Sequence, residues 1–427
     1  MNVLVVGGGG REHAIIKKLK ESKSLGEIYC APGNGGIAKD AKCVDIAATN
    51  VSAMVEFAQR NAIGYVVVAP DDPLVMGMVD ALQLVGIPAF GPSKAAAQIE
   101  GSKIFAKDLM KRYGIPTGEY QAFDLIDDAR RYLDARNGYP VVIKADGLAL
   151  GKGVIIAQNR AQALEALDLM MQQKTFGESG AKVVIEEFLT GPEVSVLAFT
   201  DGHTVVPMVS SMDHKRALDG DRGPNTGGMG TIAPNPFYTK EIADVCMKTI
   251  FEPTVKAMRL EGATFRGCLY FGLMLTPDGP KVIEYNCRFG DPEAQVVLPL
   301  LKGDLLEIMR STNTGTLARQ SIEWADAAAA CVILASGGYP GKYPTALPIK
   351  GLDDDGQLPG KTVYHAGTRL DESGTFITAG GRVMGVSATA PTLPLALSGA
   401  YAGVEAVQFE GVHFRRDIGK SGTPSEV

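Results

Sequence analysis

Short apolar runs alternate with amphipathic stretches over the first hundred residues of the chain. Residues 3–6, 28–31 and 65–69 are apolar runs typical of buried strands, and helical spacing is found between them. This alternation predicts a parallel sheet covered by helices on both faces, including a helix over residues 74–85. Glycine-rich turns follow the first two strands, at the edge of a parallel sheet where ligands bind.

The first glycine-rich turn, residues 7–10, does not fit a dinucleotide-binding motif. Read from Gly7, the G-x-G-x-x-G frame requires glycine where Glu12 stands, and read from Gly8 it requires glycine where His13 stands. A nicotinamide-dependent oxidoreductase is therefore disfavoured. The turn still places N–H groups at a helix N-terminus, which suits a phosphate, although the glycines could simply make a tight turn.

A second pair of apolar strands, near residues 139–144 and 153–157, flanks a glycine-rich hairpin. Lys144 ends the first of these strands, and a lysine in such a run is rarely buried without an anionic partner. The hairpin is not a Walker A loop, because Gly153 stands where a hydroxyl residue would bind Mg²⁺. We interpret it as a flap over phosphates, although an ordinary hairpin with an extended lysine would show the same pattern.

The strand over residues 281–288 has polar side chains at alternate positions. Glu284, Asn286 and Arg288 are expected to point from one face, because side chains alternate along a strand. A carboxylate and an amide oxygen suit Mg²⁺, and a guanidinium suits a phosphate. A strand with a solvated outer face would show the same alternation, so this strand alone leaves both interpretations open.

Three further segments have the chemistry of a ligand site. Residues 210–234 are glycine-rich and lack periodicity, which favours a substrate loop; His214 within it could be a base or a simple hydrogen-bonding residue. The helix expected over residues 94–113 contains Gly101, which could divide it and turn Lys103 towards a nucleotide or leave it in solvent. Residues 183–195 join two strands and could receive an adenosine.

Length and composition narrow the class of protein. With 427 residues, the chain should form about two to four domains. The net charge of −6 and the lack of a basic run exclude a nucleic-acid surface, and no apolar run is long enough for a membrane span. The N-terminus lacks a secretory signal pattern, and the six cysteines are scattered without a CxxC pair. We therefore expect a reduced, cytoplasmic protein.

Taken together, these motifs resemble the ATP-grasp superfamily and, within it, the phosphoribosylamine–glycine ligase family. The resemblance covers nearly the whole chain. The chain departs from the family at residues 69–72, Ala-Pro-Asp-Asp, where Gly-Pro-Glu is usual, and at Leu150, where a small residue is usual. The motifs that carry the resemblance are residues 9–13, 31–34, 100–103, 143–149, 151–154, 213–216, 223–230, 286–293, 365–368, 380–383 and 415–419.

The resemblance implies an α/β protein with an ATP-grasp fold, an N-terminal parallel α/β (pre-ATP-grasp) domain and a small C-terminal α/β domain. The expected bounds are 1–101, 102–326 with a flexible lid at about 117–190, and 327–427. The implied reaction joins glycine to 5-phosphoribosylamine through glycyl phosphate, giving glycinamide ribonucleotide, ADP and phosphate in purine (IMP) biosynthesis. Another ATP-grasp carboxylate–amine ligase and a non-catalytic nucleotide-binding module are the alternatives. We expect a monomer that binds no nucleic acid and no membrane.

The resemblance also implies roles for individual residues towards ATP and the metal. Arg288 would stabilise the transferring phosphoryl group, and Arg288, Lys144 and Asp213 are the catalytic candidates. Glu284 and Asn286 would hold Mg²⁺ or Mn²⁺. The residues expected to contact ATP are Lys103 and Lys144 at the phosphates, Gly151, Lys152 and Gly153 in the flap, Glu186, Glu187, Phe188 and Leu189 at the adenine, and Glu193 at the ribose.

The remaining implied roles concern glycine and phosphoribosylamine. The turn at Gly9, Gly10 and Arg11 would lie near the sugar phosphate. Asp291 or Glu293 would pair with the ammonium group of glycine. The full set of residues expected to hold these substrates is Gly9, Gly10, Arg11, Asn34, Asp213, Lys215, Gly227, Gly228, Met229, Asp291 and Glu293.

Overall fold

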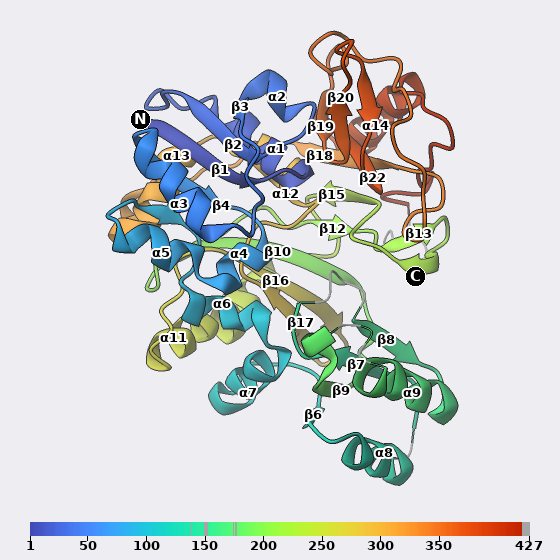
Figure 1. Ribbon diagram of the computed structural model, residues 1–427. Coiled ribbons are helices and arrows are strands. Elements are labelled where there is room, and N and C mark those ends of the chain that lie inside the picture. The colour runs from blue at the N-terminus through green and yellow to red at the C-terminus, as the bar shows by residue number, and fades with distance from the viewer. Residues whose placement is uncertain (137, 149–152, 174, 176, 421–427) are drawn as a thin grey trace.

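The computed structural model describes residues 1–136, 138–148, 153–173, 175 and 177–420 (Figure 1). The N-terminal part is a parallel five-stranded sheet in the order β3-β2-β1-β4-β5. This confirms the parallel sheet predicted from the alternating pattern. Its strands are β1 (Asn2–Gly7), β2 (Ile28–Pro32), β3 (Lys42–Cys43), β4 (Ile63–Val68) and β5 (Ala89–Phe90).

Helices pack around this sheet. The helix expected over residues 74–85 begins earlier and is divided at Gly77, whose positive φ of 94° ends one helix and starts the next. The helix expected over residues 94–113 is divided at Gly101, and Ser102 caps its second half by accepting from the N–H of Phe105. The helices are α1 (Gly10–Leu19), α2 (Ile37–Asp40), α3 (Val51–Arg60), α4 (Asp71–Met76), α5 (Met78–Leu84), α6 (Lys94–Gly101) and α7 (Lys103–Tyr113).

A second, antiparallel sheet lies at the centre of the molecule, in the order β11-β10-β16-β17. Its strands are β10 (Glu193–Thr200), β11 (Val205–Pro207), β16 (Gly267–Thr276) and β17 (Gly279–Asn286). Leu4 and Val66 of the first sheet share a core with Leu269 and Phe271 of β16, so the two sheets form one body. The helical run α10 (Lys240–Cys246), Met247–Phe251 and α11 (Glu252–Leu260) packs on this core.

A smaller antiparallel sheet, in the order β6-β9-β7-β8, forms a separate lobe that we call the lid (Figure 1). Its core is its own and includes Leu133, Ile143 and Leu167. Strands β7 and β8 pair directly, which confirms the predicted hairpin, although Gly151 and Lys152 of the flap lie outside the described residues. The elements are β6 (Tyr120–Phe123), α8 (Ile126–Ala135), β7 (Val141–Ala145), β8 (Val154–Ala157), α9 (Arg160–Leu167) with its continuation Asp168–Gln172, and β9 (Val183–Glu187).

The C-terminal part is built on a five-stranded sheet in the order β12-β15-β18-β22-β19, whose strands come from two separate parts of the chain. Two of its strands come from residues 210–234, which the sequence pattern indicated as an irregular loop; that expectation was wrong. Each strand there is too short to show alternation, and β15 is fixed by pairing with β18, about a hundred residues later. The strands of this sheet are β12 (Met212–Asp213), β15 (Gly230–Ala233), β18 (Ala328–Ala335), β19 (Thr362–His365) and β22 (Arg382–Ala390). Two separate two-stranded sheets are formed by β13 (Arg216–Leu218) with β14 (Arg222–Asn225) and by β20 (Thr368–Leu370) with β21 (Phe376–Thr378).

Helices complete the fold. Helix α14 (Leu393–Ala406) packs on β18 and β22, whereas α12 (Ala294–Val297) and α13 (Leu305–Thr314) lie against the N-terminal sheet and its helices. Among the described residues, no helix combines the length and apolar character that crossing a membrane requires.

Candidate active site

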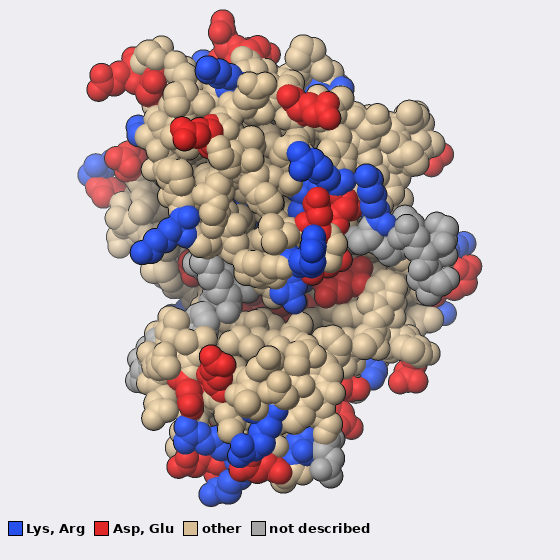
Figure 2. Space-filling view, turned by 90° about the vertical axis from the view of Figure 1, so that its right-hand side faces the viewer, with Lys and Arg blue, Asp and Glu red and all other residues tan. Residues whose placement is uncertain are grey.

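A hollow separates the lid from the rest of the molecule, and acidic and basic side chains gather in it (Figure 2). One strand, β17, runs along this hollow from the lid towards the other domains. A β-bulge lies opposite Gly272 and Leu273 of β16 and leaves Ile283 without a paired residue. As a result, Val282 and Tyr285 both enter the core, and Glu284 shares the opposite face with Asn286.

Glu284 lies among three lysines. Its carboxylate oxygen Oε1 is 3.8 Å from Nζ of Lys215, and 32% of its side chain is exposed. Burial opposes the ionisation of Glu284, but Lys215, Lys144 and Lys103 together hold its pKa below the usual value. A carboxylate kept ionised and partly open to solvent is suited to bind a cation.

Asn286 supplies a second oxygen on the same face. The amide orientation that satisfies its neighbours has Nδ2 donating to Oε1 of Glu100 at 2.9 Å and to the carbonyl of Tyr285 at 3.1 Å. This orientation leaves the amide oxygen available as a ligand. Among the described residues, no group of three His, Cys, Asp or Glu side chains could hold a metal ion.

Arg288 comes after the end of β17 and is already paired with acids. Its Nη2 lies 2.9 Å from Oε1 of Glu100 and 3.8 Å from Oδ2 of Asp71, whereas its buried Nε has no partner among the described atoms. Burial opposes the charge of Arg288, but Glu100 and Asp71 raise its pKa above the usual value. Asp71 stands in the segment that departs from the family pattern, and it contacts this arginine.

Lysines approach β17 from two directions. Lys103, at the start of α7, donates to the carbonyl of Gly147 at 2.8 Å, in the strand-to-flap turn. Lys144, on β7, donates to the carbonyl of Ile283 at 3.0 Å and lies 3.1 Å from Oε2 of Glu186. The structure therefore brings Lys144 into contact with the bulge of β17, as expected for a buried lysine with an anionic partner.

One residue of this cluster was not identified from the sequence. Lys107 lies 2.8 Å from Oε2 of Glu186, and burial lowers the pKa of Lys107 to about 8 against the effect of Glu186. The signal was present, because Lys103 and Lys107 are four residues apart and so share one face of α7.

The segment expected to receive an adenosine lies at the end of β9. Oε1 of Glu186 is buried and has no hydrogen-bond partner among the described atoms. Glu187 accepts from the N–H of Glu119 at 3.1 Å, and Phe188 and Leu189 follow β9 as half-buried residues. Exposed Glu193, at the start of β10, lies 3.3 Å from Nζ of Lys215. Gly153 is buried and its carbonyl accepts from the N–H of Ala145.

Two acids, the half-buried Asp213 and the buried Glu293, interact electrostatically, and Lys215 also acts on Asp213. Among the described residues, no lysine or arginine nitrogen forms an ion pair with either carboxylate; Glu293 accepts from the hydroxyl of Ser195 at 3.4 Å, and Asp213 accepts from the N–H of His214. Burial, reinforced by Glu293, raises the pKa of Asp213 well above its usual value. The Ser195 hydroxyl also lies 2.8 Å from that of Tyr270.

Asp291 differs from these two acids because it already has partners. Its Oδ2 lies 2.8 Å from Nη2 of Arg382 on β22, and its Oδ1 accepts from Nε2 of Gln295 at 2.6 Å. Arg382 holds the pKa of the Asp291 carboxyl below its usual value, against the effect of burial. The turn at Gly10 is close by, because a Cβ added there would meet Gln295 Nε2 at 2.6 Å and Asp291 Oδ1 at 3.5 Å.

A side chain of helix α1 already bonds to the first glycine-rich turn. The N–H of Gly9 donates to Oε2 of Glu12 at 2.6 Å, so it is not free for a phosphate. Arg11 lies 2.7 Å from Oε1 of Glu12 and also donates to the carbonyl of Phe289. Nδ2 of Asn34 donates hydrogen bonds to the carbonyls of Gly8 and His365, so Asn34 connects this turn to the C-terminal part.

Residues 227–229 contact the rest of the protein in different ways. Gly227 offers its carbonyl to Nη1 of Arg382 at 2.6 Å. Gly228 has a φ of 111°, and a Cβ there would meet Pro292 at 2.5 Å and Asp213 at 2.6 Å, so only glycine fits. Met229 is fully buried and both its backbone groups bond within the protein, so it supports the loop and does not line the hollow.

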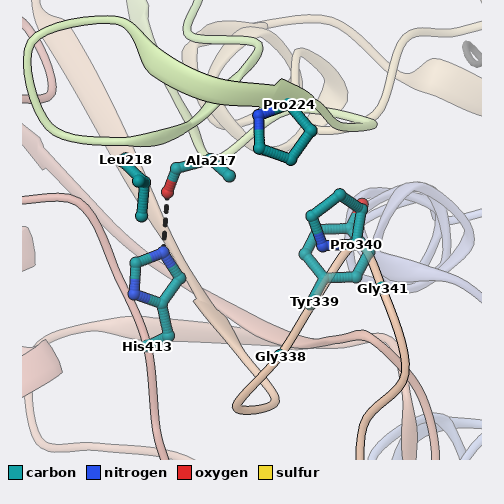
Figure 3. Close-up of a pocket in the computed structure, with 8 residues that line it drawn as sticks. All are labelled: Ala217, Leu218, Pro224, Gly338, Tyr339, Pro340, Gly341 and His413. Carbon is teal, nitrogen blue, oxygen red and sulfur yellow. Dashed lines mark hydrogen bonds between the residues drawn. The ribbon is translucent and has the colours of Figure 1, made fainter.

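His214 and a pocket near the C-terminal sheet both lie outside this arrangement. His214 bonds the carbonyl of Gly230 and the N–H of Gly419, which is a structural role. The pocket, of about 490 Å³, lies between β13–β14 and the turn at residues 338–341, and His413 within it bonds the carbonyl of Ala217 (Figure 3). Its lining includes none of the residues described above.

Comparison with known proteins agrees with this arrangement. Residues 1–100, 101–294 and 329–421 match the N domain, the ATP-grasp (A) domain and the C domain of phosphoribosylglycinamide synthetase, respectively. The chain is 50% identical over 418 residues to phosphoribosylamine–glycine ligase of Caldanaerobacter subterraneus, covering 98% of this chain and 99% of that protein. It is 48% identical to the enzyme of the same name from Rhizobium meliloti, covering 98% of each.

Solved structures extend the comparison. The crystal structure of phosphoribosylamine–glycine ligase from Thermotoga maritima matches with a TM-score of 0.85 and 33% identity, covering 98% of this chain and 100% of that one. The biotin carboxylase domain of a Hydrogenobacter thermophilus 2-oxoglutarate carboxylase shares the fold, with a TM-score of 0.76 and 19% identity over 97% of this chain and 91% of that one. The chain thus belongs to the phosphoribosylamine–glycine ligase family and is an ATP-grasp ligase.

Proposed function

We propose that this chain joins glycine to 5-phosphoribosylamine and couples the reaction to cleavage of ATP to ADP and phosphate. The substrates come from the activity named for its relatives, and the product would be glycinamide ribonucleotide, a precursor in purine biosynthesis. The observation that carries the proposal is the setting of β17. It places Glu284 among three lysines, while the half-buried Asp213 and the buried Glu293 form no direct ion pair among the described residues.

The lid face of β17 is suited to ATP. Oε1 of Glu186 is a buried acceptor without a partner, which the amino group of an adenine would satisfy. Lys103 and Lys144 are then placed to bind the phosphates, and Glu193 would accept from the ribose. The flap residues Gly151 and Lys152 lie outside the described residues, so their role stays a prediction.

The donor set of Glu284 and Asn286 fits a hard divalent cation. We propose Mg²⁺ or Mn²⁺, because both prefer oxygen ligands and accept two protein ligands together with phosphate oxygens. Bound there, the cation would neutralise charge on the phosphates of ATP. The lysines around Glu284 keep the carboxylate ionised for this purpose.

Asp213 and Glu293 are the better candidates for the ammonium group of glycine. Two interacting carboxylates, one buried and one half-buried, favour a positive charge beside them, and a small ammonium ion supplies it. The sequence left Asp291 and Glu293 as alternatives, and the contacts favour Glu293, because Asp291 is already bonded to Arg382 and Gln295. Glycine held in this way would direct its carboxylate towards β17.

The reaction then needs no nucleophile from the protein. A carboxylate oxygen of glycine attacks the γ-phosphorus, ADP leaves, and glycyl phosphate forms. The amine of phosphoribosylamine attacks the carbonyl carbon; the C–O bond to phosphate breaks and the amine loses a proton. Catalysis is therefore positioning and charge neutralisation, for which Arg288, Lys144 and Lys103 are suited.

All these residues come from one chain, so we propose that a monomer is active. A direct test mixes the protein with ATP, Mg²⁺, glycine and freshly generated phosphoribosylamine, and measures phosphate release. Release that requires both substrates supports the proposal. Turnover with a different carboxylic acid and none with glycine would instead support another ATP-grasp carboxylate–amine ligase.

A further inference from the structure

Lys107 is buried, and its ammonium group contacts other side chains of the protein. Its ammonium group lies 2.8 Å from Oε2 of Glu186, donates to the hydroxyl of Thr117 at 2.8 Å, and lies 5.8 Å from the centre of the Tyr120 ring. Thr117 in turn donates to the carbonyl of Val282 at 2.7 Å, which fixes it to β17. Two of the three N–H donors of the Lys107 ammonium group are therefore used by Glu186 and Thr117.

Glu186 has two lysines but needs only one counter-ion. Both lysines approach the same oxygen, Oε2, and Oε1 is left buried without a partner. Lys144 is the lysine that the proposed function assigns to the phosphates of ATP. If Lys144 turns to a phosphate, a second cation must stay beside Glu186 to balance the charge of its buried carboxylate.

We propose that Lys107 is a positioning residue that acts as the permanent counter-ion of Glu186. It would keep the free oxygen of Glu186 available for the amino group of adenine, and it would leave Lys144 available for the phosphates. The proposal rests on the proposed placement of ATP. It makes Lys107 a determinant of base specificity, although Lys107 touches no part of the nucleotide. An ionised carboxylate can only accept hydrogen bonds, whereas a protonated one can also donate.

The preference for adenine over another base tests this role of Lys107. Inosine triphosphate has a carbonyl oxygen where ATP has the amino group, so an ionised Glu186 accepts a hydrogen bond from ATP and repels the inosine base. In Lys107→Met, Lys144 is the one described cation left beside Glu186, so the free carboxylate oxygen is no longer held for the adenine amino group when Lys144 turns to a phosphate. We expect the ratio of kcat/KM for ATP to that for inosine triphosphate to fall by about tenfold or more, since hydrogen bonds to charged groups discriminate at this level.

Lys111 provides a matched control on the same helix. It lies 5.9 Å from the centre of the same Tyr120 ring but is exposed, and it has no ion pair with Glu186 among the described contacts. Lys111→Met removes the same charge and should leave the ratio unchanged. The KM for glycine should also stay constant in both variants, because neither lysine faces Asp213 or Glu293.

Thr117→Val gives a second route if Lys107→Met does not fold. It keeps the charge of Lys107 but removes the hydroxyl that holds it, so the ratio should fall in the same direction by a smaller factor. A ratio equal to that of the wild type in the folded variant would overturn the inference. Wild-type turnover with glycine tests the proposed function separately, so the two can fail independently.

Discussion

Nη2 of Arg382 and Oδ2 of Asp291 lie 2.8 Å apart and join the C-terminal sheet to the segment that follows β17. The same guanidinium donates to the carbonyls of Asp291 at 2.7 Å and Gly227 at 2.6 Å. One side chain therefore fixes the two loops that flank Asp213 and Glu293, from a strand about ninety residues further along the chain. Its planar fork suits several acceptors at once, which a lysine would not match.

Arg382→Met should consequently weaken the use of glycine and phosphoribosylamine, with kcat/KM for each lowered by about tenfold or more, because the half-buried Asp291 loses its cation. The KM for ATP should change by less than about twofold, since the lid contacts are untouched. Steady-state kinetics with each substrate varied in turn checks this. Arg369→Met, an exposed arginine on β20 of the same region, is the control. An equal loss towards ATP would contradict the assignment.

Glu284→Gln should lose most of the rate, about a hundredfold or more, because a neutral amide binds a divalent cation poorly. Folding should be normal, since a third of this side chain is exposed and its nearest cation is 3.8 Å away. A titration of rate against Mg²⁺ should show a raised requirement for the metal. Asp278→Asn, in the turn between β16 and β17, removes a charge from the same hairpin and should change neither. Unchanged activity in Glu284→Gln would refute its role as a metal ligand.

Arg288→Lys should keep the positive charge but lose the fork that reaches Glu100 and Asp71 together. We expect kcat to fall by about tenfold or more, with a small change in the KM for ATP, because the residue is proposed to act on the transferring phosphoryl group. A pre-steady-state measurement of ADP formation separates this step from product release. If kcat is retained and only the KM for ATP rises, Arg288 binds the nucleotide but does not assist the transfer.

Asp213→Asn should stabilise the ligand-free protein at alkaline pH while impairing the use of glycine. The pKa of Asp213 is raised in the folded state, so its ionisation destabilises the fold: the cost is absent below the unfolded value of 3.8, grows as pH rises and is complete above the folded value. The melting temperature of the variant should therefore exceed that of the wild type by about 2 °C or more at pH 8, with the gain vanishing towards pH 4. A lower melting temperature at pH 8 would mean that the carboxylate has a compensating cation.

The elements with strong local patterns were predictable from the sequence. The N-terminal strands are buried on both faces, so they appear as continuous apolar runs, and β7 and β8 are apolar strands joined by a glycine-rich turn. The shared face of Glu284 and Asn286 also followed from alternation. It survives because the bulge at Ile283 precedes both residues.

Contacts between distant segments could not be predicted in the same way. Strand β15 is fixed by its pairing with β18, and no local signal in a short glycine-rich stretch shows that partner. Arg382 and Asp291 meet for the same reason. The pairing of Lys107 with Glu186 depends on how the lid packs on α7, which sequence spacing along α7 alone does not give.

The most direct test of the central claim follows oxygen atoms. Glycine labelled with ¹⁸O in its carboxylate is incubated with the protein, ATP, Mg²⁺ and phosphoribosylamine, and the released phosphate is analysed by mass spectrometry. If glycyl phosphate forms and the amine displaces phosphate, one labelled oxygen per turnover appears in phosphate, and none appears without phosphoribosylamine. Phosphate released without label during product formation would contradict activation of the glycine carboxylate by phosphoryl transfer.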